Sequence, residues 1–328
     1  MKLLINKNVL SALLIFAFAL VLAGCNRSGG QGTGGGGGDK KKIVGFSQME
    51  NDGPWRIAET KSMREEAAKR GYELIITDAQ KQTSKQISDV EDLVARGVSA
   101  IFLAPREFEG LAPALAAAKE AKIPVFLIDR EAAGKVGEDY VTFIGSNFVQ
   151  QGERVGEWLA KNTGGKAGII ELQGTAGASV AIDRAQGFRN AIGKYPDMKI
   201  LASQPANFSR AEGQKVMENL IQAHGKNITA VYTHNDEMAL GAIQALKAAN
   251  MNPGKDVKVV SVDGQKSALE AIMAGDLNIT VESNPRFGPI AFDTYEKFLR
   301  REQLQPKIIL EDKFYEPGNA AQFVAEAY

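Results

Sequence analysis

The chain has 328 residues, and its 39 basic and 39 acidic side chains give a formal net charge of zero. This length exceeds what one compact core usually serves, so it favours two lobes. The balanced charge argues against nucleic-acid binding, the single cysteine excludes an internal disulfide, and two histidines do not suggest a histidine-rich metal site.

The first 24 residues have the pattern of a bacterial lipoprotein signal peptide. Lys2 and Lys7 precede an apolar run over residues 9–22, which is too short and wrongly flanked for a stop-transfer helix. The sequence LAGC follows and resembles a lipobox, so we expect cleavage before Cys25 and lipidation of its thiol. A cysteine that is simply buried is less consistent with this position.

Residues 25–41 are rich in glycine and lead into the body of the chain. Such a segment cannot bury apolar surface and is typical of a flexible tether. We therefore expect an extracytoplasmic protein, in the periplasm or at the cell surface, that is anchored to a membrane through the lipid alone. No later stretch approaches the apolar length of a membrane helix.

From residue 43 to residue 128 the chain predicts a strict alternation of strands and helices. The expected strands are 43–46, 72–77, 98–103 and 125–128, and the expected helices are 55–70, 82–96 and 111–121. The stretch 125–128 is short, continuously apolar and partly β-branched, which is typical of a strand buried on both faces. The alternation therefore predicts right-handed crossovers and a parallel sheet.

A second run of the same kind follows. Its expected strands are 141–144, 167–172, 200–203, 230–233, 257–262, 277–282 and 308–311, and its expected helices are 150–162, 179–191, 211–224, 237–249, 269–274 and one that includes Phe292 and Phe298. The sequence therefore predicts an α/β protein with two doubly wound parallel-sheet lobes in tandem. No short repeat is evident, so a solenoid is not indicated.

Polar and aromatic side chains follow several of these strands at the same relative position. They are Asp52, Gly53, Pro54, Trp55, Arg56, Asp129 and Arg130 in the first lobe, and Arg184, Phe208, Asn235, Asp263 and Glu282 in the second. In open α/β sheets, ligands bind outside the carboxyl ends of the strands. If the two lobes face each other across these edges, all of these residues line one cleft.

This set has the chemistry of a site for a polyol. Carboxylates and guanidinium groups make strong hydrogen bonds to sugar hydroxyls, and the rings of Trp55 and Phe208 can cover the C–H faces of a sugar. Structural alternatives remain open for several members. The two rings could belong to the core, Asp236 could cap the helix that starts beside it, and Asp263 could serve a turn.

Five segments in this order make the chain resemble the type I periplasmic sugar-binding proteins of ABC transporters, in the ribose-binding group. They are IPVFLIDR, ELQGTAGASVAIDRAQGF, SQPANFSR, THNDEMALGAIQAL and SVDG. Within this group, GFSQMENDGPWRIAET is most similar to the galactofuranose-binding members, because ribose binders have two phenylalanines where Trp55 and Arg56 stand. Those members have glycine in place of Pro54, so galactose, arabinose and ribose remain alternative ligands.

The resemblance implies two lobes joined by three crossovers, near Gly145, Asn284 and Gln305. The first lobe would hold 42–144 and 285–304, and the second 145–284 and 305–328. The lobes would close by hinge bending on a monosaccharide and deliver it to an ABC permease. No cofactor, metal or nucleic acid is expected, and the protein would be a monomer. Presentation of the sugar to a chemoreceptor or sensor is the alternative use.

The resemblance also assigns roles to residues. The loop from Asp52 to Arg56, together with Asp129, Arg130, Arg184, Asn235 and Asp263, matches ligand-contacting positions, and Phe208 matches an aromatic residue that packs on the sugar. Glu282 lies in TVESNP, a segment that departs from the ribose binders.

Two other functions are less consistent with the sequence. A sugar-responsive transcription regulator needs a helix-turn-helix ahead of the body, where this chain has the predicted signal and tether. A glycoside hydrolase needs two carboxylates that flank the bond, such as Asp129 and Asp263, but neighbouring arginines are expected to hold both ionised. No nucleophile elbow, phosphate loop or metal motif appears, so we expect no enzyme activity.

Overall fold

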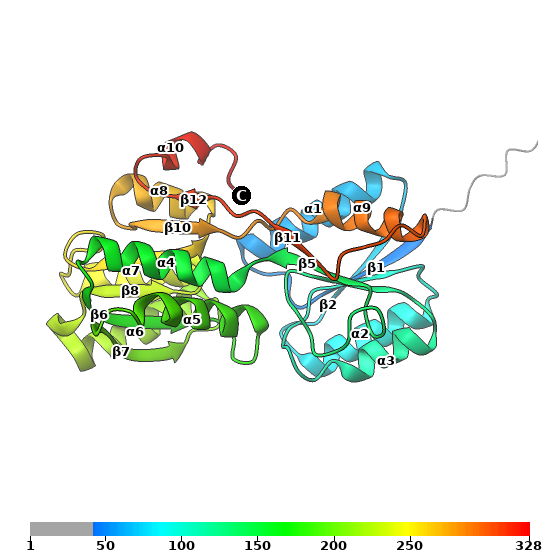
Figure 1. The fold of residues 1–328 in the computed structure, drawn as a ribbon, viewed down its shortest axis with the longest axis horizontal. Helices are drawn as coiled ribbons and strands as arrows, with labels where there is room; N and C mark the ends of the chain where they lie inside the picture. Colours follow the sequence, from blue (N-terminus) through cyan, green and yellow to red (C-terminus); the bar gives the residue numbers. More distant parts are fainter. Residues whose placement is uncertain (1–41) are drawn as a thin grey trace, which may run out of the picture. The chain divides into compact units, whose positions relative to one another are not determined.

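The computed structural model describes residues 42–328. The predicted signal peptide, the lipidation of Cys25 and the tether therefore lie outside the described residues. The described part contains two α/β lobes, each built on a six-stranded sheet with helices packed against it (Figure 1). Within residues 42–328, we find no helix with both the length and the apolar character needed to cross a bilayer.

The sheet of the first lobe is parallel throughout, with the strand order β11-β5-β4-β3-β1-β2. Its strands are β1 (Ile43–Gln48), β2 (Glu73–Asp78), β3 (Ile101–Leu103), β4 (Val125–Ile128), β5 (Thr142–Ser146) and β11 (Lys307–Leu310). Its helices are α1 (Pro54–Lys69), α2 (Thr83–Ala95), α3 (Ala112–Glu120) and α9 (Gly288–Leu299).

The sheet of the second lobe has the order β12-β10-β9-β8-β6-β7, and only β12 is antiparallel to its neighbour. Its strands are β6 (Lys166–Gln173), β7 (Asp197–Pro205), β8 (Ala230–Thr233), β9 (Lys258–Asp263), β10 (Ile279–Glu282) and β12 (Phe314–Tyr315). The helical segments are α4 (Phe148–Asn162), α5 (Ser179–Ile192), α6 (Arg210–His224), η1 (Gly225–Asn227), α7 (Asp236–Ala248), α8 (Lys266–Ala274) and α10 (Ala320–Phe323).

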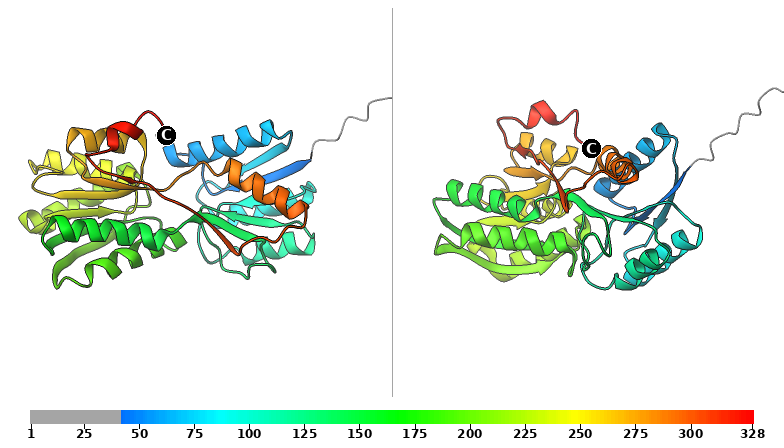
Figure 2. Two further views of the ribbon diagram at one scale, coloured as in Figure 1. Left: turned by 45° about the horizontal axis from the view of Figure 1, so that its top comes forward. Right: turned by 45° about the vertical axis from the view of Figure 1, so that its right-hand side comes forward.

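Strand β4 shows why its sequence is continuously apolar. Successive side chains of a strand point to opposite faces of the sheet. Val125 and Leu127 join the core formed with α2 and α3, whereas Phe126 and Ile128 join the core formed with α1 and α9. Both faces of the sheet are therefore covered by helices (Figure 2), and every side chain of β4 is buried.

The chain passes between the lobes three times, at residue 147, at 283–287 and at 311–313. The expected crossover near Gln305 is wrong, because Lys307–Leu310 pairs in parallel with β5 in the first sheet. Residues 305–310 therefore belong to the first lobe, where Ile308 and Leu310 pack against its core. The first crossover also comes later than Gly145, since β5 continues to Ser146 before α4 begins.

Candidate functional site

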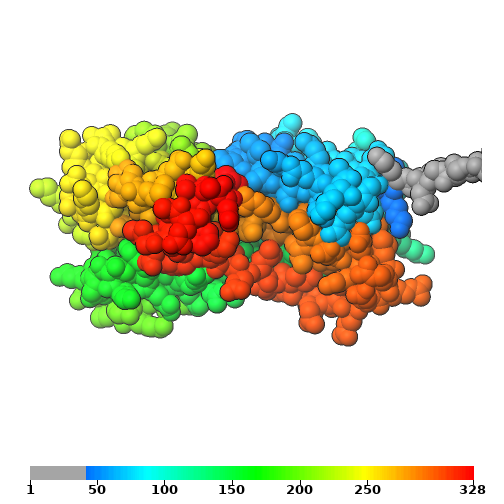
Figure 3. Space-filling model, turned by 90° about the horizontal axis from the view of Figure 1, so that it is seen from above, coloured from blue at the N-terminus to red at the C-terminus, as the bar shows by residue number. Residues whose placement is uncertain are grey.

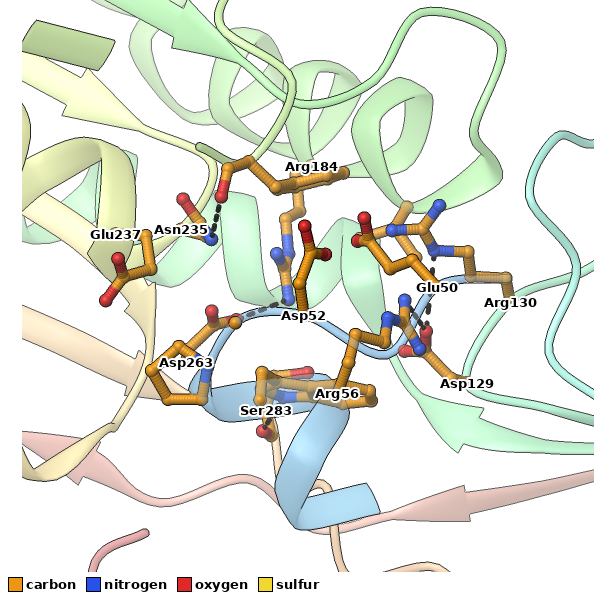
Figure 4. A pocket seen from close by; sticks show the side chains of 15 residues that line it. Glu50, Asp52, Arg56, Asp129, Arg130, Arg184, Asn235, Glu237, Asp263 and Ser283 are labelled. Carbon is orange, nitrogen blue, oxygen red and sulfur yellow. Dashed lines mark hydrogen bonds and ion pairs between the residues drawn. The ribbon is translucent and has the colours of Figure 1, made fainter. Parts of the chain in front are cut away.

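A cavity lies between the two lobes, at the carboxyl ends of the strands of both sheets (Figure 4). Its volume is about 60 Å³, on a scale on which one water molecule needs roughly 10–15 Å³. This is room for one small molecule rather than for a chain of sugar units. The lining residues are Glu50, Asp52, Gly53, Pro54, Trp55, Arg56, Asp129, Arg130, Val180, Arg184, Phe208, Asn235, Glu237, Asp263 and Ser283.

Arg56 forms the charged centre of the first-lobe wall. Pro54 begins α1, so Arg56 stands in its first turn, where one guanidinium nitrogen lies 2.6 Å from Asp129 Oδ2 and another 2.8 Å from Glu59 Oε2. Burial opposes the charge, but the two carboxylates outweigh it and raise the pKa of Arg56 above its ordinary value. Arg56 is therefore a fixed cation, and its guanidinium also lies 4.5 Å from the centre of the Trp55 ring.

Arg130 supplies a second buried cation in this wall. Burial and the nearby Arg56 lower the pKa of Arg130 to about 10, so it remains charged at neutral pH. One of its terminal nitrogens donates to the Arg106 carbonyl, but its Nε has no hydrogen-bond partner among the described residues. Its guanidinium lies 5.2 Å from the centre of the Phe208 ring, which belongs to the other lobe.

Arg184 is the corresponding cation of the second lobe. It extends from α5, is only 2% exposed, and donates from Nε to Gln151 Oε1 at 2.9 Å. A terminal nitrogen donates to the His234 carbonyl, and the other lies 3.5 Å from Asp263 Oδ1. Arg184 is thus held from three sides at the wall of the cavity.

Asp263 differs from what the sequence analysis expected. Burial raises the pKa of Asp263 well above its ordinary value, and Arg184 compensates only in part, while the carboxyls of Asp236 and Asp129 add to the rise. Asp263 therefore does not have the lowered pKa that a neighbouring arginine was expected to produce. The backbone is also unusual here, because Asp263 and Asp129 have positive φ angles of 137° and 63°, and such strain concentrates at functional sites.

Asn235, rather than Asp236, caps helix α7. Asn235 Oδ1 accepts a hydrogen bond from the Met238 backbone N–H at 3.0 Å, and its Nδ2 donates to the Phe208 carbonyl at 3.3 Å. The prediction that Asp236 caps this helix is therefore wrong by one residue. Asn235 lines the cavity while its side chain holds the end of β8 and the segment that carries Phe208.

The Asp236 carboxylate has a structural role beneath the cavity. It is fully buried, and burial raises its pKa to about 6 despite the hydrogen bonds that favour the charged form. It accepts hydrogen bonds from the hydroxyls of Ser261 and Thr280 and from the backbone N–H groups of Gly264 and Gln265. These bonds fix the turn after β9 and thereby the position of Asp263.

Glu282 does not line the cavity, which corrects its assignment from the sequence. Its Oε1 accepts from the Tyr315 hydroxyl at 2.9 Å, and its Oε2 accepts from the Lys313 backbone N–H at 3.0 Å. Both partners lie at β12 and the crossover before it, so the carboxylate serves the sheet edge. The next residue, Ser283, lines the cavity instead, because neighbouring side chains at a strand end point to opposite sides.

Four lining residues were missed by the sequence analysis: Glu50, Val180, Glu237 and Ser283. Val180 stands four residues before Arg184 on α5, and residues with this spacing share one face of a helix. Glu237 directly follows the polar pair at the start of α7. Helical spacing could therefore have identified Val180, whereas the sequence carries no comparable signal for Glu50.

Asp52 stands at the exposed rim of the cavity. Lys81 Nζ lies 2.9 Å from its carboxylate and 3.1 Å from that of Glu50. Slight burial raises the pKa of Asp52, but the hydrogen bonds with Lys81 and Glu50 and the charge of Lys81 together lower it below its ordinary value. Asp52 is thus an ionised carboxylate at the rim that pairs with Lys81. Asp129 is instead buried in the wall and pairs with Arg56.

The two aromatic rings serve both the core and the cavity, so the alternatives left open by the sequence are not exclusive. Trp55 Nε1 donates to the Ser283 carbonyl at 2.7 Å, and its ring lies 6.1 Å from that of Phe287 in the first-lobe core. Phe208 packs against the cores of both lobes. Each ring therefore presents an apolar surface to the cavity from a fixed position.

Comparison with known proteins identifies the family. Residues 44–299 match the family described as "periplasmic binding protein domain". The chain belongs to the periplasmic binding protein family. It is 44% identical over 283 residues to the galactofuranose-binding protein YtfQ of Escherichia coli, over 85% of this chain and 89% of YtfQ. It is 37% identical to the ribose import binding protein RbsB of Bacillus subtilis, over 82% of this chain and 85% of RbsB.

Solved structures of this family agree with the fold. A crystal structure of a galactofuranose-binding protein has a TM-score of 0.85 and 42% identity, over 87% of this chain and 98% of that one. The arabinose-binding component of an ABC transporter from Shewanella sp. ANA-3, bound to arabinofuranose, has a TM-score of 0.84 and 42% identity, over 87% and 95%. The predicted two-lobed fold and the predicted family are confirmed.

Members of the periplasmic binding protein family are substrate-binding proteins that act outside the cytoplasm, so the predicted solute-binding function is confirmed at this level. Within residues 42–328, no group of three or more histidine, cysteine, aspartate or glutamate side chains is arranged to hold a metal ion. The cavity is lined mainly by arginines, acids, one amide and two aromatic rings.

Proposed function

We propose that this protein captures a monosaccharide in furanose form, galactofuranose or a related aldose such as galactose, arabinose or ribose, and delivers it to an ABC importer. The observation that carries the proposal is the cavity, whose buried arginines, buried acids and two aromatic rings surround space for one small molecule. The similarity to proteins named for galactofuranose and arabinofuranose supports the furanose form.

The polar groups of the cavity favour a ligand that carries many hydroxyls. The Nε of Arg130 lies 3.4 Å from Asp129 Oδ2 without a hydrogen bond, so it can donate to a hydroxyl oxygen. The buried carboxyl of Asp263 can exchange a hydrogen bond with a hydroxyl. A hydroxyl that finds no partner in a closed cavity costs roughly 1–3 kcal/mol. A fixed set of donors and acceptors therefore selects among sugars by the directions of their hydroxyls.

Hinge closure explains how the ligand is enclosed. Two hydrogen bonds join the lobes beside the cavity, from the Phe108 N–H to the Gly177 carbonyl at 2.9 Å and from the Glu131 N–H to Ser179 Oγ at 3.0 Å. The C-terminal segment also lies against α1 (Figure 3), where Tyr328 and Ala58 line a shared groove. The lobes must separate for a ligand to enter, as in hinge-bending binding proteins generally.

A panel of sugars tests the proposal. Galactofuranose, galactose, arabinose and ribose are added to the protein, and the free energy of unfolding is followed by thermal or denaturant melts. At a hundredfold excess over the dissociation constant, a bound sugar should stabilise the protein by about 2.7 kcal/mol. A disaccharide should produce no shift, because the cavity holds one small molecule. The proposal is contradicted if no monosaccharide changes the melt and none co-purifies by mass spectrometry.

We also infer that the sugar leaves chemically unaltered, as expected for a family of binding proteins. Arg56 lies 2.6 Å from Asp129 Oδ2, so this carboxyl is already engaged by a side chain of the cavity wall. Incubation with a glycoside of the bound sugar should release no free monosaccharide. Release at a rate that depends on Asp129 and Asp263 would instead support a hydrolase.

Gly174 offers a test of the aromatic wall. A Cβ atom at this position would stand 1.9 Å from Phe208 Cζ, so Gly174→Ala must displace the ring. Because aromatic packing contributes roughly 0.5–1.5 kcal/mol, we expect the dissociation constant for the sugar to rise about threefold to tenfold in calorimetry. Gly318→Ala is the control, since its added Cβ would meet nothing within 4 Å. Equal affinity for the sugar in both variants would show that Phe208 does not contribute to binding.

The anchor and the assembly are part of the same proposal. We infer that the protein is a monomer held at the membrane by a lipid on Cys25, within diffusion distance of its permease. Mass spectrometry of the mature N-terminal peptide should show a diacylglyceryl group on this cysteine. Cys25→Ser should release the protein into the soluble extracytoplasmic fraction. Presentation of the sugar to a chemoreceptor remains the second use, and it would require the same closed form.

A further inference from the structure

One buried side chain connects the ligand cavity to all three crossovers between the lobes. Gln151 lies in the first turns of α4, which begins directly after the first crossover, and it is 1% exposed. Its Nε2 donates to the Glu282 carbonyl at 3.1 Å, where the second crossover starts, and to Asp312 Oδ2 at 2.8 Å in the third crossover. Its Oε1 accepts from Arg184 Nε at 2.9 Å.

The orientation of this amide is fixed by its surroundings. Both hydrogens of Nε2 face acceptors, the Asp312 carboxylate and the Glu282 carbonyl, while Oε1 faces the donor Nε of Arg184. A flipped amide would place oxygen against both acceptors and nitrogen against a guanidinium, so it would lose every bond. The side chain therefore has one arrangement in which all of its hydrogen-bonding groups are satisfied.

Asp312 extends the connection to β5 and α4, the two elements that the first crossover joins. Its Oδ1 accepts from Ser146 Oγ at 2.8 Å, at the end of β5, and its carbonyl accepts from an Arg154 nitrogen on α4 at 2.7 Å. The first and third crossovers are thus bonded to each other as well as to Gln151. A rotation between the lobes changes the backbone at these crossovers, and hence the positions of the groups to which Gln151 is bonded.

We propose that Gln151 is a positioning residue that couples the orientation of Arg184 in the cavity to the hinge between the lobes. The coupling rests on the proposed function, since it assumes that Arg184 contacts the bound sugar. When the lobes are closed, Gln151 accepts from Arg184 and holds its guanidinium at the cavity wall. When the crossovers rotate, the same amide is drawn away, and Arg184 loses one of the three acceptors that orient it.

Two substitutions separate the halves of this connection. Gln151→Leu removes all three hydrogen bonds, whereas Gln151→Glu keeps an acceptor for Arg184 but loses both donors to the crossovers. Gln150→Leu is the matched control, because Gln150 is the exposed neighbour on the same helix.

Two quantities are measured on each full-length variant: the dissociation constant for the sugar, by calorimetry, and the distribution of distances between spin labels on the two lobes, with and without sugar. Gln151→Leu should raise the dissociation constant roughly tenfold to hundredfold, where tenfold corresponds to about 1.4 kcal/mol, and should broaden the distances in the sugar-free protein. Gln151→Glu should broaden the distances with a smaller change in affinity. Gln150→Leu should stay within about threefold of the parent in affinity and keep the parent's distances.

The outcomes distinguish the possible failures. If Gln151→Leu melts at a lower temperature but keeps the parent's affinity and distances, the residue is merely structural and the coupling is refuted. The same conclusion holds if Gln151→Glu leaves the distances unchanged, and this variant serves when the leucine variant does not fold. If the parent binds no sugar at all, the proposed function fails, whereas the distances of the sugar-free variants still decide whether Gln151 restrains the hinge.

Discussion

Arg184→Met should raise the dissociation constant for the sugar by roughly a hundredfold or more. Hydrogen bonds to a charged group contribute roughly 1.5–3 kcal/mol each, and methionine retains the apolar stem without any donor. The substitution also removes the guanidinium that lies 3.5 Å from Asp263, whose pKa is already raised by burial. In calorimetry, we expect binding of the preferred sugar to fall below detection at protein concentrations that suit the parent.

The control for this experiment is Arg96→Met. Arg96 forms an exposed pair with Asp92 on α2, far in sequence from the cavity residues, and such surface pairs contribute about 1 kcal/mol or less. The Arg96→Met variant should bind the sugar with the affinity of the parent. An Arg184→Met protein that folds and binds sugar with unchanged affinity would show that the second-lobe wall does not hold the ligand.

Arg56→Met should lower the free energy of unfolding by about 3–5 kcal/mol at neutral pH, which is the usual cost of breaking a buried ion pair by removing one partner. The reason is that Asp129 and the fully buried Glu59 both lose the cation that lies 2.6–2.8 Å from them. Binding of the sugar should be lost as well. Urea unfolding at pH 5, 6, 7 and 8 measures the effect.

The pH dependence of this defect has a definite sign. Burial raises the pKa of Glu59 from 4.5 to about 7 even with Arg56 present. The folded state therefore binds more protons than the unfolded state between these values, and this carboxyl makes stability fall as pH rises through the window. Without Arg56 the pKa should rise further, so the defect should be smaller at pH 5 than at pH 8.

A double variant isolates the carboxyl responsible. Arg56→Met combined with Glu59→Gln removes one of the two uncompensated acids, and it should recover part of the lost stability at pH 8 but little at pH 5. A defect of the same size at every pH, unaffected by Glu59→Gln, would contradict the account of Arg56 as the cation that compensates the burial of Glu59.

The sequence predicted the alternation of strands and helices because the two buried sheets leave a strong mark on it. A strand covered on both faces, such as β4, must be apolar throughout, and polar residues return where it ends. This rule placed Asp129 and Asp263 at the carboxyl ends of strands in their respective sheets, where both line the cavity. It could not distinguish Glu282 from Ser283, because one residue at a strand end decides which side a side chain faces.

Other features leave little local trace in the sequence. Asparagine and aspartate are both good helix caps, so the sequence does not decide between Asn235 and Asp236. The structure decides, because the Asp236 carboxylate accepts hydrogen bonds from the hydroxyls of Ser261 and Thr280 instead. The pattern of 308–311 predicts a strand, but not which of two similar sheets it joins. Strand β12 has two residues and offers no periodicity at all.

The ion pairs of the cavity have a consequence for how the protein opens. Arg56 pairs with Asp129 inside the first lobe, and Arg184 with Asp263 inside the second; among residues 42–328, no ion pair joins one lobe to the other. The contacts that do join them include backbone and hydroxyl hydrogen bonds. Separation of the lobes therefore breaks hydrogen bonds but no ion pair among these residues, and each arginine keeps its carboxylate partner in the open protein.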